Sequence, residues 1–124
     1  MRYVLLLLVL AGCARSPEPA PVEQAPAPPA PRENVAVAGL LESARADAAA
    51  GRLPTAAASL ERALRIEPRN PRLWQELARV RLQQGDYAQA ESTAARSNSW
   101  AGSDNALRAE NQRIIERARE AASR

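Results

Sequence analysis

One internal offset constrains this chain more than any other feature. Comparing the sequence with itself places similar residues 34 positions apart, and the pairs are Leu40 with Trp74, Ala44 with Ala78, Arg45 with Arg79, Gly51 with Gly85, Leu53 with Tyr87, and Ala56 with Ala90. A fixed period of this length indicates repeated supersecondary units, each too small to bury its own apolar face alone. We therefore expect similar units stacked in a row.

Turn-forming residues divide each unit into two helices. Gly51 and Gly85 stand where a first helix would end, because glycine readily adopts the left-handed conformation that closes a helix. Pro54 suits the first turn of a second helix, where its missing N–H costs little. Pro68 ends that helix, and Asn70 can cap the next one.

This pattern resembles the tetratricopeptide repeat family, whose unit is two antiparallel helices in 34 residues. The first unit would span residues 37–70 and the second residues 71–104. The matching motifs are Trp74-x-x-Leu77-Ala78 and Gly85-Asp86-Tyr87-x-x-Ala90 in the second unit, and Ala56, Leu60, Ala63 and Leu64-Arg65-Ile66-Glu67-Pro68 in the first. The chain departs from the family pattern at Ser43, Arg81 and Ala94, and no proline closes the second unit. The resemblance implies an all-α fold, with two helix pairs and a capping helix forming a short right-handed α-solenoid.

The same resemblance implies a repeat core in which small residues stand where helices cross and larger apolar ones fill the space between them. Trp74, Leu77 and Tyr87 are then core residues rather than a ligand cage. The predicted core set is Leu40, Ala44, Ala56, Leu60, Ala63, Trp74, Leu77, Ala78, Tyr87 and Ala90.

Residues 104–123 carry apolar side chains at helical spacing, with charges on the opposite side. We expect a capping helix there, after a turn that contains Trp100 and Gly102, with Ser103 or Asp104 as its N-cap. Its apolar positions are Leu107, Ile114, Ala118 and Ala121. Two units and a cap fall short of the three or more repeats that usually bury a continuous core. A homodimer through the exposed end of the stack is an open alternative.

The N-terminus carries a secretory pattern: Arg2, then an apolar run from Val4 to Leu10 that is too short to span a bilayer. The tetrapeptide Leu10-Ala11-Gly12-Cys13 resembles the lipobox of bacterial lipoproteins. The resemblance implies that residues 1–12 are a signal peptide and that Cys13 carries a diacylglyceryl group on its sulfur and a second lipid on its amino group, which together anchor stably. Ala14 after the cysteine implies the outer membrane of a Gram-negative bacterium, with the protein facing the periplasm. An ordinary secretory signal with an incidental cysteine is the alternative.

Residues 13–34 follow as a tether rich in alanine and proline, with prolines at Pro17, Pro19, Pro21, Pro26, Pro28, Pro29 and Pro31. This composition favours polyproline II over a packed core. At about 3.1 Å per residue, such a spacer holds a domain up to roughly 60 Å from the lipid surface. A proline-motif ligand for a partner domain is the alternative. The helical domain would occupy residues 35–124.

Composition argues against several functions. Histidine is absent and the only cysteine is the predicted anchor, and we find no Gly-rich phosphate loop and no metal-ligand cluster. The sequence therefore predicts neither an enzyme nor a cofactor or metal. The net charge is +3, and the charges of both signs are interspersed rather than gathered into a basic block. We expect no nucleic-acid partner.

The architecture instead predicts binding of a protein or peptide, because the first helices of stacked pairs line a concave surface. On helical spacing the groove residues are Leu41, Arg45, Ala48, Arg72, Gln75, Arg79, Leu82 and Gln83. Arg45 and Arg79 stand one repeat apart, so their guanidinium groups could grip a carboxylate of a partner. Alternatively they pair with neighbouring acidic residues, which are Glu42, Glu76 and Asp47. We predict a membrane-anchored periplasmic adaptor in envelope assembly; the alternative is a self-associating structural lipoprotein that recruits nothing.

Overall fold

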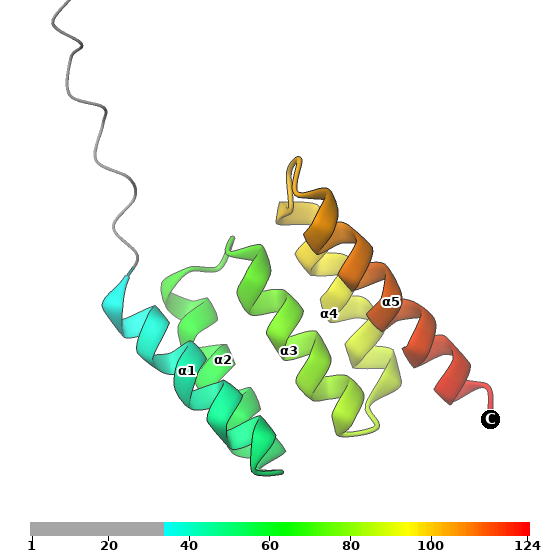
Figure 1. Cartoon of the computed structure of the whole chain (residues 1–124), viewed down its shortest axis with the longest axis horizontal. Helices are drawn as coiled ribbons and strands as arrows, with labels where there is room; N and C mark the ends of the chain where they lie inside the picture. The colour runs from blue at the N-terminus through cyan, green and yellow to red at the C-terminus, as the bar shows by residue number, and fades with distance from the viewer. Residues whose placement is uncertain (1–33) are drawn as a thin grey trace, which may run out of the picture. The chain divides into compact units, whose positions relative to one another are not determined.

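Five helices follow one another along residues 34–124, the part of the chain that the computed structural model describes (Figure 1). They are α1 (Val35–Ala49), α2 (Leu53–Ile66), α3 (Pro71–Gln83), α4 (Tyr87–Trp100) and α5 (Asn105–Ala122). Neighbours in sequence pack as antiparallel neighbours in space, and only helices and turns occur between residues 34 and 124. The predicted all-α fold class is confirmed. The predicted signal peptide, Cys13 and the tether up to residue 33 lie outside the described residues.

Local sequence signals set where the helices begin and end. Asn34, Asn70 and Asp104 cap α1, α3 and α5, each accepting backbone N–H groups of the first turn through its side-chain oxygen. Gly51 and Gly85 both have φ of +77°, the left-handed conformation expected after α1 and α3. The predictions for Asn70, Gly51 and Gly85 are therefore confirmed, and of Ser103 and Asp104 it is Asp104 that caps α5. The cap at Asn34 was not predicted. None of these five helices is long and apolar enough to cross a membrane.

The expected position of Trp100 is wrong. Trp100 is the last residue of α4 rather than part of the turn, because no glycine or proline interrupts residues 87–100. Ala101 is the C-cap, and Gly102, with φ of +54°, makes the turn into α5. The second helix of the second unit thus forms in full.

The core consists of two packed groups of apolar side chains. The larger joins α1, α2 and α3 and contains Val37, Ala44, Ala56, Ala57, Leu60, Ala63, Leu64, Leu73, Leu77 and Val80. The smaller joins α3, α4 and α5 and contains Ala78, Ala94, Ile114 and Ile115. Ala94 replaces the larger residue typical of the family, and the two isoleucines of α5 pack in the space beside it. Of the predicted core residues, Leu40, Trp74 and Tyr87 are half-buried and the other seven are buried.

A buried polar network fixes α5 on α3 and α4. Asn111 and Ser97 are completely buried, and Asn111 Nδ2 donates to Ser97 Oγ at 2.8 Å and to Asn98 Oδ1 at 2.8 Å. Gln75 Nε2 donates to Asn111 Oδ1 at 3.0 Å, and Ser97 Oγ donates to the Pro71 carbonyl at 2.7 Å. Each of these side chains therefore has partners inside the domain, as buried polar groups require.

Candidate partner-binding groove

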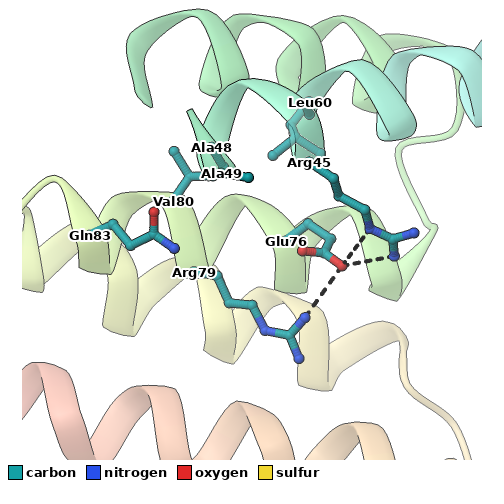
Figure 2. A pocket seen from close by; sticks show the side chains of 9 residues that line it. Arg45, Ala48, Ala49, Leu60, Glu76, Arg79, Val80 and Gln83 are labelled. Carbon is teal, nitrogen blue, oxygen red and sulfur yellow. Dashed lines mark hydrogen bonds and ion pairs between the residues drawn. The ribbon is translucent and has the colours of Figure 1, made fainter. Parts of the chain in front are cut away.

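The helices α1, α3 and α5 together form one side of the domain, which we call the inner face. Two hollows lie on it. One, of about 260 Å³, lies between α1 and α3, and a shallower one of about 450 Å³ lies where α1, α3 and α5 meet. Arg45, Glu76 and Arg79 line both. These three side chains therefore lie at the centre of the inner face (Figure 2).

A continuous row of ion pairs crosses the inner face, which we call the charge ladder: Glu42, Arg45, Glu76, Arg79, Glu110 and Arg113. Its five N–O distances fall between 2.9 and 3.3 Å. Glu76 is its hub, because one oxygen, Oε1, accepts from Nε and Nη2 of Arg45 and from Nη1 of Arg79. In Figure 2 the two guanidinium groups approach this oxygen from different sides. Arg45 and Arg79 are thus paired with acidic neighbours, the simpler of the two possibilities raised by the sequence.

The ladder follows the repeat period into α5. Glu42, Glu76 and Glu110 are successively 34 residues apart, and so are Arg45, Arg79 and Arg113. Sequence reasoning missed Glu110 and Arg113 because it followed the offset through two units only. The same spacing, extended once more, would have found them. Helix α5 therefore occupies the place of a first helix in a third unit.

The ladder changes the protonation equilibria of two of its members. Hydrogen bonding to Glu76 is the main cause that raises the pKa of Arg45. Hydrogen bonding from Arg113, with a further contribution from Arg79, lowers the pKa of Glu110 below its usual value. Both shifts favour the charged forms of Arg45 and Glu110.

The deeper hollow owes its space to small side chains. Ala44, Ala48 and Ala49 of α1 line it on one side, Val80 lines it on the other, and Leu60 of α2 lies at its floor. Its further lining residues are Arg45, Glu76, Arg79 and Gln83. An apolar floor with a charged and polar rim is the composition that orients a bound group while burying its apolar part.

The remaining predicted groove residues divide into three groups. Arg72 lines the shallow hollow and Gln83 the deep one, both from α3. Leu41 and Leu82 instead pack against the core. Gln75 lines the shallow hollow but is buried, and its amide donates to Leu107 and Asn111, so it is engaged within the domain. Asp47 pairs with Arg52 and not with the ladder.

Among residues 34–124, no group of three or more acidic, histidine or cysteine side chains is placed to hold a metal ion. The cluster on the inner face is a mixed array of guanidinium and carboxylate groups. Such an array offers hydrogen-bond donors and acceptors to a partner.

The fold and the inner face define a class of protein. Residues 47–109 match the sequence model described as tetratricopeptide repeat, and the chain belongs to this family. Its helices and inner face are those of a repeat domain that takes part in protein interactions.

A solved structure gives a more particular likeness. The globular C-terminal domain of LpoP from P. aeruginosa is 44% identical in sequence and superposes with a TM-score of 0.72. The match covers 74% of this chain and 87% of that one. Among curated proteins, none matches the sequence significantly.

Proposed function

We propose that this protein is a lipid-anchored adaptor of the bacterial envelope that binds a segment of a partner protein on its inner face. The observation that carries the proposal is the apolar hollow between α1 and α3, with Arg45, Glu76 and Arg79 at its rim (Figure 2). The family resemblance supports a binding role, because stacked repeats use this face to hold peptides and helices. The proposal gives the domain no catalytic role.

The size of the hollow favours a protein side chain over a small molecule. Pockets that enclose a drug-sized ligand measure roughly 300–1,000 Å³, and this one measures about 260 Å³ and is open to solvent. It can take one apolar side chain of a peptide against Ala48 and Val80. The rest of the peptide would then lie along the inner face.

The rim favours an acidic residue beside that apolar one. The side chains of Arg45 and Arg79 are 50% and 37% exposed, and each guanidinium carries five N–H donors, more than the ladder uses. A carboxylate of the partner can therefore bind without displacing Glu76. A charge-assisted hydrogen bond of this kind contributes about 1.5–3 kcal/mol before desolvation is counted.

Affinity capture from crosslinked envelopes tests the groove with matched variants. Arg45→Gln/Arg79→Gln removes both positive charges and keeps a polar amide donor at each position. Ala49→Leu fills the mouth of the hollow from an exposed position, and Ala58→Leu makes the same change on the exposed surface of α2. We expect a partner that is captured by wild type and Ala58→Leu and lost from the other two. Equal capture by all four proteins would contradict the proposed groove, and recovery of the protein alone would favour a self-associating lipoprotein.

The location is a separate part of the proposal. We propose that residues 1–12 are removed, that Cys13 is acylated and that Ala14 directs the protein to the outer membrane, with residues 35–124 in the periplasm. Labelled palmitate should enter wild type and not Cys13→Ser, and labelled wild type should fractionate with the outer membrane. Absence of label from wild type would contradict the anchor and leave the groove proposal intact.

A further inference from the structure

The largest exposed apolar side chains gather at one end of the domain. Within residues 34–124 these are Val35, Ile66 and Trp100, with exposed fractions of 85%, 46% and 41%. Val35 begins α1, Ile66 ends α2 and Trp100 ends α4. Because the helices alternate in direction, all three lie at the end that holds the start of α1, the α2–α3 turn and the α4–α5 turn (Figure 1). We call it the tether end, since residues 1–33 join the domain there.

Arginines without ion-pair partners gather at the same end. Counting ion pairs among the described residues only, seven of the arginines from Asn34 onward have a partner and seven do not. Five of the seven without a partner lie at the tether end: Arg65, Arg69, Arg72, Arg96 and Arg108. The acidic residues nearby, Glu67 and Asp104, are engaged by Asn70 and by the first turn of α5. The tether end is therefore both positively charged and partly apolar.

Arginine side chains and apolar side chains alternate on the surface of the tether end. Arg69 stacks over the Trp100 ring at 5.4 Å, and Arg96 stacks over the Trp74 ring at 5.2 Å. Ile66 borders an open hollow between α1 and α2 that is lined partly by small and apolar residues. Exposed tryptophan, aliphatic side chains and arginine are the composition of surfaces that lie at a membrane interface, where indoles sit at headgroup level and guanidinium groups meet lipid phosphates.

We propose that the tether end docks on a bilayer surface containing anionic phospholipid. Two observations favour a bilayer as the binding surface. The positive charge of the tether end complements anionic headgroups, and only residues 14–33 separate the domain from the proposed anchor at Cys13. A spacer of that length keeps the domain within roughly 60 Å of the surface, at an effective concentration on the order of millimolar. Because of this high effective concentration, even a weak affinity of the tether end for lipid is enough to keep it docked. Docking at this end leaves the hollow between α1 and α3 open to a partner, since none of the tether-end residues lines it.

Vesicle sedimentation of residues 14–124 tests the proposal independently of lipidation and of the groove. This piece contains all the described core residues, and the C-terminal domain of the LpoP relative is itself globular. We expect binding to vesicles of phosphatidylethanolamine and phosphatidylglycerol and much weaker binding to phosphatidylcholine alone. Arg69→Gln/Arg96→Gln should weaken binding by about 25-fold, at about fivefold per arginine. Trp100→Ala should weaken it by about fivefold.

The matched control removes two charges from the opposite end. Arg117 and Arg124 lie in and after the last turns of α5, so Arg117→Gln/Arg124→Gln should change binding by less than about twofold, because charges beyond a Debye length are screened. Circular dichroism confirms that each variant is folded. No sedimentation with anionic vesicles, or an equal loss in both double variants, would overturn the proposal. So would a Trp100→Ala variant that dissociates a dimer and leaves vesicle binding unchanged, because the occupant would then be a second copy.

Discussion

The buried network around Asn111 makes a quantitative prediction about stability. Asn111→Ala removes three hydrogen bonds from a completely buried site, to Ser97, Asn98 and Gln75. At about 1 kcal/mol net for each bond, the loss is about 3 kcal/mol. Ser97 Oγ still donates to the Pro71 carbonyl and one N–H of Gln75 still reaches the Leu107 carbonyl, but the second N–H of Gln75 and the Oδ1 of Asn98 each lose a partner. The stranded Gln75 donor adds to this loss, so about 3 kcal/mol is the smallest cost that we expect.

For a domain of this size, a loss of about 3 kcal/mol lowers the melting temperature by roughly 12–24 °C. Urea denaturation followed by circular dichroism measures the free energy of unfolding directly. The neighbouring variant Gln112→Ala is the control, since it removes one exposed hydrogen bond to Glu116 and should cost less than about 0.5 kcal/mol. If Asn111→Ala were within about 1 kcal/mol of wild type, the network would not be what fixes α5, and the reasoning would fail.

Three further predictions concern glycine and charge. Gly85→Ala should destabilise the domain by about 1–2 kcal/mol, because Gly85 has φ of +77°; urea denaturation measures this. Gly39→Ala should instead stabilise it by about 0.5–1 kcal/mol in the same assay, since Gly39 lies within α1 with open space around its Cβ position. Hydrogen bonding from Arg113 lowers the pKa of Glu110 in the folded state. The ionised carboxylate therefore stabilises the fold at pH values above its usual pKa of 4.5, and this stability is lost as the pH falls through the lower folded pKa. The difference in unfolding free energy between wild type and Glu110→Gln should therefore be largest at neutral pH and shrink in acid; a difference independent of pH would contradict the ladder.

Helix boundaries could be predicted from the sequence because local residues encode them. Gly51, Gly85 and Asn70 act on the backbone of their own turns, so no knowledge of neighbouring helices is needed. The prediction for Trp100 was wrong because tryptophan does not itself end a helix. The helix continues through Trp100, and the turn is made by Gly102, two residues later. Glycines and capping residues therefore predict that a helix ends nearby. They do not decide whether a neighbouring residue such as Trp100 belongs to the helix or to the turn.

Contacts between helices were harder to predict. Asn111 interrupts the apolar stripe of α5, and a polar residue in a stripe gives no sign of the buried partners that satisfy it. Arg81 stands where the family usually has tyrosine, and it reaches Glu61 of α2 at 2.7 Å across 20 residues of sequence. Such pairings depend on how the helices pack. The repeat period is the exception, because it relates equivalent positions such as Arg45 and Arg79 without any structure.

The most direct test of the account is site-specific photocrosslinking in living cells. A photoreactive residue at Gln83, beside the hollow of the inner face, is compared with the same residue at Ala58, on the exposed surface of α2. We expect a discrete crosslinked partner from Gln83, reduced by Arg45→Gln/Arg79→Gln, and none from Ala58. A partner crosslinked from Ala58 and not from Gln83 would contradict it.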